Sequence, residues 1–132
     1  MKRLKLVSAV LLVSGLVAYG CGGSSTSPSE ACNQVQETTC AKLYSCFTAA
    51  QLQQAGYPAT EAACVTMSEQ DQGCAAETEA NACSGAGANA VYHGENVQGC
   101  IDQLNNLTCT DLMGSNVDAK APKCDEICIV PT

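Results

Sequence analysis

The distribution of cysteines constrains this chain more than any other feature. Eleven of its 132 residues are cysteines, and ten of them follow residue 31. An even set of cysteines at irregular spacings is typical of a disulfide framework in a small exported domain. The ten that we predict to form structural disulfides are Cys32, Cys40, Cys46, Cys64, Cys74, Cys83, Cys100, Cys109, Cys124 and Cys128.

The chain also offers little material for an apolar core, which makes cross-links necessary. It has no tryptophan, and Phe47 is its one phenylalanine. Small exported domains compensate for thin cores with disulfides, each worth typically about 2–4 kcal/mol. We therefore expect a small fold whose stability depends on cross-links as much as on packing.

The first twenty residues have the three parts of an export signal. Three basic residues lie within the first five, an apolar run extends from Leu6 to Tyr19, and small residues lead to a break. The apolar run is shorter than the roughly 20 residues that a transmembrane helix needs. We predict that residues 1–20 are a signal peptide, with a retained transmembrane anchor as the alternative.

The signal ends in VAYGC at residues 17–21, which resembles the lipobox of bacterial lipoproteins. The resemblance implies that Cys21 is lipidated and becomes the first residue of the mature chain. Several acyl chains on one residue suffice for stable anchoring, because each buried methylene contributes about 0.8 kcal/mol. Gly22 stands where an aspartate retains lipoproteins at the inner membrane, so the resemblance implies an outer-membrane location. The alternative is an ordinary secretory signal with an unrelated cysteine.

Removal of residues 1–20 would leave a strongly acidic chain. Three lysines would remain against thirteen carboxylates, which gives a net charge of −10. Such a surface repels nucleic acids and anionic lipid headgroups, so we expect neither as a direct ligand. The membrane is expected to be a partner through the lipid anchor.

Capping signals and apolar periodicity predict an all-α, disulfide-rich bundle of about four helices. The first helix is expected to start at Ser27, which with Pro28 and Glu30 has the pattern of a capping box. Its apolar face carries three cysteines. The later helices are expected over residues 48–56, 60–72 and 94–107, with one more turn at 110–113.

The remaining segments are expected to be irregular. Residues 84–88, SGAGA, indicate a loop, and the tail is expected to lack regular structure although Cys124 and Cys128 hold it. Few runs alternate between apolar and polar residues, so few strands are expected. The chain then divides into a signal peptide (1–20), a lipidated cysteine with a flexible tether (21–29) and a disulfide-stapled helical domain (30–132).

The three cysteines of the first helix share a face, but no two of them can form a disulfide. A rise of 1.5 Å per residue separates Cys32 from Cys40 by about 12 Å and Cys40 from Cys46 by about 9 Å. A disulfide requires Cα atoms roughly 4.4–6.8 Å apart, so each must reach another segment. We predict a Cys46–Cys64 bridge across the helix–loop–helix corner. The other pairings stay open, because ten cysteines allow roughly 900 combinations.

No residue pattern indicates catalysis. His93 is the only histidine, and a Cys–His pair would need a free thiol, which export to an oxidising space disfavours. We interpret His93 as an exposed residue at a helix start. The cysteines also lack the C-x-x-C pairs that are typical of zinc, haem and thioredoxin-like sites. We expect no catalytic residue, no cofactor and no metal, and hence no enzyme.

Carboxylates between residues 69 and 79 raise the question of a calcium site. With Gly73 at the sixth position of an EF-type loop, Glu79 would occupy the twelfth, but neutral glutamines occupy the third and fifth. We interpret the stretch as a solvated acidic surface. Asn106-Leu107-Thr108 matches a glycosylation sequon, but it lies within a predicted helix and we treat it as chance.

The chain as a whole resembles short, cysteine-rich bacterial lipoproteins, a group without an assigned activity. The resemblance rests on the lipobox, on C-x7-C-x5-C in the first helix and on CIDQLNNLTC at residues 100–109. It implies a lipid-anchored module on the periplasmic or extracellular side, with a structural or binding role and an envelope protein as candidate partner. The alternative is an inhibitor or accessory subunit of a secreted or envelope hydrolase, with residues 82–90 as the contacting loop.

Overall fold

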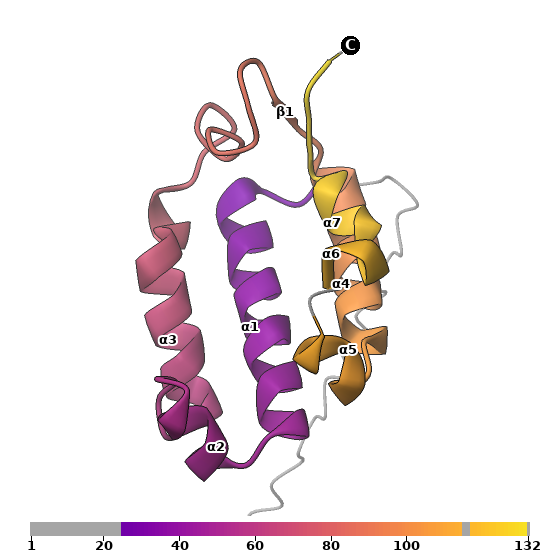
Figure 1. Ribbon diagram of the computed structural model, residues 1–132. Helices are drawn as coiled ribbons and strands as arrows, with labels where there is room; N and C mark the ends of the chain where they lie inside the picture. Colours follow the sequence, from indigo (N-terminus) through magenta and orange to yellow (C-terminus); the bar gives the residue numbers. More distant parts are fainter. Residues whose placement is uncertain (1–24, 115–116, 132) are drawn as a thin grey trace, which may run out of the picture.

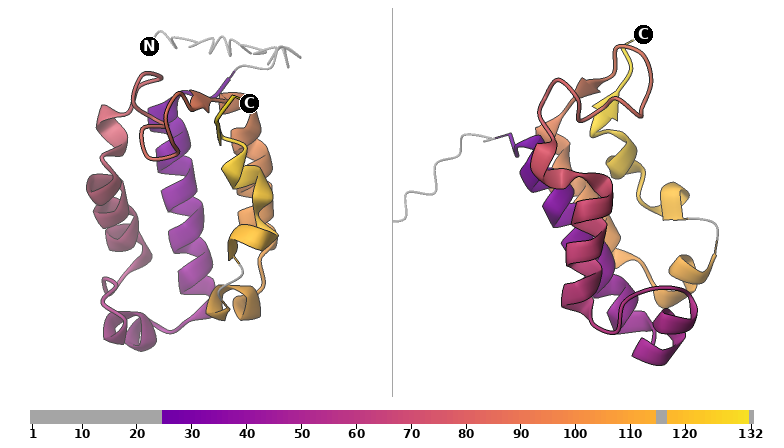
Figure 2. Two further views of the ribbon diagram at one scale, coloured as in Figure 1. Left: turned by 45° about the horizontal axis from the view of Figure 1, so that its top comes forward. Right: turned by 90° about the vertical axis from the view of Figure 1, so that its left-hand side faces the viewer.

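A central helix with helices on both sides organises the domain (Figure 1). The computed structural model describes residues 25–114 and 117–131. Helix α1 (Pro28–Cys46) lies between α3 (Glu61–Gln72) on one side and α4 (Val97–Asn106) on the other. The left view of Figure 2 again shows these three helices side by side, with α1 in the middle. The described residues thus confirm the predicted helical, disulfide-rich fold class, with seven α-helices and a short two-stranded ribbon where the sequence predicts an all-α bundle of about four helices.

Local capping explains where α1 begins. The Ser27 side chain accepts a hydrogen bond from the Glu30 backbone N–H at 3.4 Å, and Pro28 occupies the first turn, where no backbone N–H is needed. The reciprocal bond of the predicted capping box does not form in the described structure. Instead, the Glu30 carboxylate accepts a hydrogen bond from Gln34 Nε2 at 3.3 Å. The helix ends where Phe47 adopts an extended backbone.

Two threonine-capped helices follow, as predicted. Helix α2 (Ala49–Gln54) starts at a complete capping box: Thr48 Oγ1 accepts from the Gln51 N–H, and Gln51 Oε1 accepts from the Thr48 N–H. Thr60 caps α3 with one such bond: its Oγ1 accepts a hydrogen bond from the Ala63 N–H. Helix α3 ends at Gly73, whose φ of 70° lies in the left-handed region that glycine tolerates. It runs antiparallel to α1 (Figure 1).

Irregular chain covers the end of the bundle where α1 begins. After α3, a 3-10 turn, η1 (Cys74–Ala76), and a series of turns lead to a second 3-10 turn, η2 (Gly94–Asn96). The loop predicted at residues 84–88 lies within these turns. The helix predicted from residue 94 therefore starts as η2 and becomes α4 at Val97.

A two-stranded ribbon lies at the same end of the bundle. Strand β1 (Val91–Tyr92) pairs antiparallel with β2 (Cys128–Ile129), so that Val91 lies opposite Ile129 and Tyr92 lies opposite Cys128. Strands of two residues are too short to show an alternating pattern in a sequence. Their pairing depends on contacts between segments far apart in the chain.

The C-terminal segment is more helical than the sequence predicts. Beyond α4, the described chain contains α5 (Cys109–Met113), α6 (Val117–Lys120) and α7 (Pro122–Asp125). Helix α5 matches the predicted extra turn, and Thr108 and Asp111 form its capping box. The prediction of an irregular tail is wrong for α6 and α7. Helices of four residues offer too few apolar positions to show a period in the sequence.

Disulfide sulfurs form much of the core, as the shortage of large apolar residues predicts. Among the described residues, the largest fully buried side chains are those of Val97 and four cysteines: Cys40, Cys64, Cys74 and Cys100. An apolar cluster around Cys100 includes Leu104, Leu107 and Ala121. It joins α4 to α1 and to the C-terminal helices, whereas two disulfides connect α1 to the α3 side.

Candidate functional site

The ten cysteines from Cys32 onward form five disulfides. Their paired Cα atoms are 4.5 to 6.0 Å apart, which is within the range that a disulfide requires. As predicted, no two cysteines of α1 pair with each other, because they lie more than one helical turn apart. The five bridges are Cys32–Cys74, Cys40–Cys64, Cys46–Cys109, Cys83–Cys128 and Cys100–Cys124.

The predicted Cys46–Cys64 bridge is wrong. Cys64 pairs with Cys40, which lies six residues, or about 9 Å, before the end of α1. Helix α3 runs antiparallel to α1 (Figure 1), and Cys64 in its first turn lies opposite Cys40, in the second half of α1, rather than opposite the last residue of α1. Cys46 therefore forms its disulfide with Cys109, the first residue of α5.

The disulfides determine what the cysteines are able to do chemically. Every cysteine of the described residues is in a bridge, so none of these ten offers a thiolate to a metal or a substrate. No group of three or more metal-binding side chains occurs within the part of the chain that the structure describes. Cys21, the predicted lipidation site, lies outside the described residues, as do residues 1–20.

His93 lies directly before η2, at a helix start as predicted, but its side chain is half-buried rather than exposed. Its backbone N–H donates to the Ile127 carbonyl at 2.7 Å, and its ring Nδ1 lies 2.9 Å from Glu95 Oε1. The hydrogen bond with His93 lowers the pKa of the exposed Glu95 carboxyl. These contacts hold the ribbon next to η2, which is a structural role.

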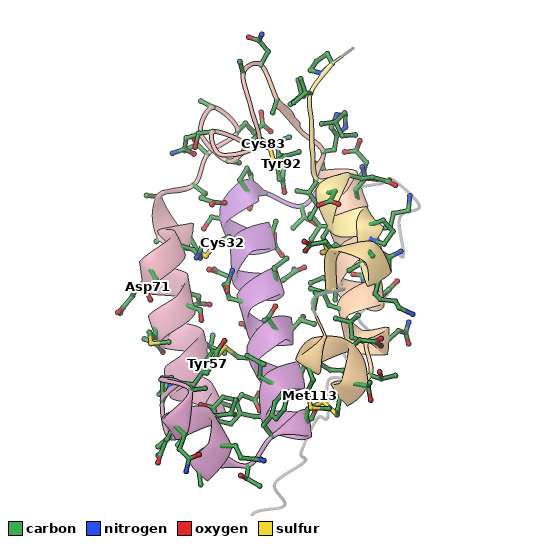
Figure 3. All side chains as sticks on the ribbon, viewed as in Figure 1. Cys32, Tyr57, Asp71, Cys83, Tyr92 and Met113 are labelled. Carbon is green, nitrogen blue, oxygen red and sulfur yellow. A yellow bond between two sulfur atoms is a disulfide. The ribbon has the colours of Figure 1, made fainter. Side chains whose placement is uncertain are left out.

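The acidic stretch does not form an EF-type loop. Residues 68–72 belong to α3, so their side chains point in different directions around the helix instead of converging on one point. Figure 3 shows Asp71 pointing away from α1 into solvent. The sequon residue Asn106 is exposed at the last position of α4.

A small pocket lies between the start of α1, the end of α3 and the ribbon. It has a volume of about 180 Å³, and its polar lining residues are Gln36, Gln72, Glu77 and Tyr92. Burial raises the pKa of the Glu77 carboxyl. Burial also raises the pKa of Tyr92, and the negative charge of Glu77 adds to this effect. The Tyr92 hydroxyl already donates to the Thr26 carbonyl at 2.7 Å, and the volume is below the roughly 300–1,000 Å³ of typical ligand pockets.

A larger apolar groove lies at the opposite end of the bundle, with a volume of about 410 Å³. Its apolar lining comes from the end of α1, from α2 and its following turn, and from α5. Figure 3 shows two exposed residues of this end, Tyr57 and Met113. No local pattern in the sequence indicates this groove, because its segments come together only in the folded domain. The principal apolar residues are Leu43, Phe47, Leu52, Tyr57 and Leu112.

The loop proposed as a contact surface, residues 82–90, lies at the ribbon end. Cys83 ties its first turn to Cys128, and the loop leads directly into β1. The segment from Ser84 to Asn89 is exposed, and Asn89 adopts a positive φ of 64°. The middle of the loop is thus solvent-accessible, while the Cys83–Cys128 disulfide holds its start and the pairing of β1 with β2 holds its end.

Comparisons with protein-family models, with curated proteins and with solved structures find no match for this chain. None of the helices in residues 25–114 and 117–131 combines the length and apolar character that a membrane span requires.

Proposed function

We propose that this protein is a lipid-anchored lipoprotein whose folded domain has a structural or binding role outside the cytoplasm. The supporting observation is the way in which the cysteines pair. Five disulfides use every cysteine from Cys32 onward, which leaves Cys21 as the odd one. It stands directly after the export-signal pattern, where a lipoprotein carries its acyl chains.

The disulfides themselves indicate an oxidising environment. Five bridges in a domain of about a hundred residues are typical of extracytoplasmic proteins, since cytosolic thiols are kept reduced. An outer-membrane location is the finer part of the proposal, and Gly22 after the cysteine supports it.

A binding role is supported by the surface of the domain rather than by reactive groups. The larger groove is lined mostly by apolar side chains, which suit an apolar segment of another envelope protein. The polar groups of the smaller pocket are two glutamine amides, one carboxyl group and one tyrosine hydroxyl, and that hydroxyl already donates a hydrogen bond. We propose an envelope protein as the partner.

Mass spectrometry of the protein purified from membranes tests the anchor. We expect the chain to begin at Cys21 with the added mass of several acyl chains, and reduction to add two hydrogen masses for each of five bridges. The protein should enter the detergent phase of a two-phase extraction. The matched Cys21→Ser variant should enter the aqueous phase with its five bridges intact. An unmodified Cys21, or free thiols in the native protein, would contradict the proposal.

A second candidate function is inhibition of, or accessory binding to, an envelope hydrolase. The observation in its favour is the exposed loop of residues 82–90, which the Cys83–Cys128 bridge and the ribbon hold at its two sides. Stoichiometric recovery of a hydrolase in detergent pull-downs, lost with Ala88→Asp but not with Gln53→Asp on α2, would support it. Recovery of a non-hydrolytic partner would favour the first candidate.

A further inference from the structure

The chain enters the folded domain at a fixed place beside the ribbon. The Tyr92 hydroxyl, from β1, donates a hydrogen bond to the Thr26 carbonyl at 2.7 Å. Gly94 lies so close to Thr26 and Ser25 that a Cβ on this glycine would overlap both residues. Ser25 is therefore held at the end of the bundle that carries the ribbon, and the chain leaves the domain from there.

The same end carries an uncharged surface on an otherwise acidic protein. Residues 80–92 and 127–131 contain no Asp, Glu, Lys or Arg. The ribbon pairs these two segments, and the Cys83–Cys128 bridge also joins them. The whole chain has a net charge of −7. These two uncharged segments therefore differ in charge from the rest of the protein.

Three aliphatic side chains of this surface are exposed: Val91 at 48%, Ile129 at 40% and Val130 at 45%. We call these three residues the ribbon patch. Val91 and Ile129 are directly opposed across the strands, so they share the ribbon face turned away from the pocket that Tyr92 and Cys128 line. Val130, the residue after Ile129, lies next to Gly87 of the loop before β1, so all three exposed side chains lie at the same end of the domain.

The length of chain before Ser25 identifies what this surface meets. Four peptide units join Cys21 to Ser25, and an extended chain spans at most about 3.6 Å per residue, so their Cα atoms are within about 14 Å of each other. Acyl chains on Cys21 would therefore hold the ribbon end of the domain at the bilayer surface. The opposite end, where Met113 lies (Figure 3), would face away.

Resting on the proposed lipid anchor, we infer that the ribbon patch is a second membrane contact, which inserts its aliphatic side chains at the headgroup–acyl boundary beside the anchor. Three aliphatic side chains bind lipid weakly by themselves. Attachment at Cys21 makes the contact intramolecular, with an effective concentration of the order of mM, so a weak contact becomes populated.

The charges around the ribbon determine which lipids suit this contact. Burial raises the pKa of Tyr92, and the charges of Glu77, Glu30, Glu79 and Glu95 raise it further, in that order. Three of these carboxylates lie beside the ribbon in the structure: Glu77 lines the pocket together with Tyr92, Glu95 lies in η2, which follows β1, and Glu30 lies in the first turn of α1. They repel anionic headgroups at short range, so the contact favours a zwitterionic bilayer surface.

Hydrogen exchange on the full, acylated chain tests this inference. The protein is purified from membranes and placed at low surface density in phosphatidylcholine vesicles, and its intact mass is recorded. Exchange is followed by mass spectrometry in peptides that cover residues 86–93 and 126–131. The test variant is Val91→Ser with Ile129→Ser, and the control is Met113→Ser, which changes an apolar side chain 69% exposed at the other end. The reference is unacylated Cys21→Ser mixed with the same vesicles.

We expect exchange in both peptides to be several-fold slower in the acylated chain than in the reference. The Val91→Ser/Ile129→Ser variant should lose this protection, Met113→Ser should keep it, and replacement of part of the phosphatidylcholine by phosphatidylglycerol should weaken it. Because both substituted residues are about half exposed and pair across the strands, the double variant should unfold at a slightly lower temperature in buffer, and its protection is measured against its own unacylated Cys21→Ser form.

The other outcomes overturn the inference in distinguishable ways. Acyl mass on Cys21 without slower exchange would remove the membrane contact and leave the anchor standing. Protection that appears only at high protein density would indicate a second copy of the chain on the ribbon patch instead of lipid. Protection that survives Val91→Ser/Ile129→Ser would place the contact elsewhere. Absence of acyl mass would overturn the proposed anchor and this contact together.

Discussion

Cys46 and Cys109 lie 63 residues apart in the chain, yet their Cα atoms are 5.3 Å apart. Their disulfide joins the last residue of α1 to the first residue of α5 and closes the longest loop among the described bridges. It ties the end of the central helix to the C-terminal third of the domain. This pairing has consequences for connectivity and for stability.

The connectivity predicts which peptides remain linked after digestion without reduction. Cleavage after Lys42 and after glutamates yields peptides 38–42, 43–61 and 62–69, each with one cysteine. We expect 38–42 to be linked to 62–69 through Cys40 and Cys64, and 43–61 to be linked to the peptide that contains Cys109. Mass spectrometry of the unreduced digest checks this. A link between 43–61 and 62–69 would contradict the structure.

Removal of the Cys46–Cys109 bridge should cost less stability than removal of Cys40–Cys64, despite its longer loop. Loop closure alone favours the longer loop of 63 residues over that of 24 by about 0.9 kcal/mol. However, Cys40 and Cys64 are 1% and 0% exposed. Their replacement by alanine removes two buried groups, each worth at least about 0.8 kcal/mol, and leaves a cavity.

Urea unfolding of the two double-alanine variants measures this order. We expect Cys46→Ala/Cys109→Ala to lose about 2–4 kcal/mol and Cys40→Ala/Cys64→Ala to lose more. The reverse order would mean that loop entropy outweighs burial in this domain.

Gly94 and Gly99, five residues apart, should respond oppositely to substitution by alanine. A Cβ on Gly94 would overlap Thr26 and Ser25, so Gly94→Ala should destabilise the fold by about 1–3 kcal/mol. Gly99 lies inside α4, where a Cβ would meet the Lys123 side chain at an ordinary 3.5 Å. Gly99→Ala should stabilise the fold by about 0.4–1 kcal/mol. Thermal unfolding of both variants tests the pair, and equal shifts would refute the close approach at Gly94.

Replacement of Glu77 by glutamine should stabilise the protein at neutral pH. Burial raises the pKa of Glu77 in the folded state, so stability falls as the pH rises from the ordinary pKa of glutamate through the raised one. Glutamine does not ionise, so the variant avoids the free-energy cost of a partly buried carboxylate. The Glu77→Gln gain in Tm at pH 7 should therefore shrink as the pH falls through the raised pKa, and it should be almost gone below the ordinary value of about 4.5.

Glu79→Gln is the matched control for this measurement. Glu79 is exposed, so the variant removes the same charge without relieving any burial. If the two variants have the same Tm profile between pH 3 and pH 7, the effect belongs to net charge and not to the position of Glu77.

Local sequence signals predict the helices better than the surfaces. Thr60 and Gly73 delimit α3 because capping and a left-handed turn depend on neighbouring residues alone. The apolar groove and the ribbon patch could not be predicted, since Leu52 and Leu112, or Val91 and Ile129, become neighbours only when distant segments meet. The remaining site prediction, Cys21, depends on a local signal and lies outside the described residues.

By itself, the sequence determined that ten cysteines must cross-link a thin core and that those of α1 must each bind another segment. Helical rise and disulfide reach are local geometry, so no tertiary information is needed for that conclusion. Only the tertiary structure decided the partners. The antiparallel return of α3 placed Cys64 opposite Cys40 and left Cys46 to Cys109, because pairing follows the distance between Cα atoms in space and not their order along the chain.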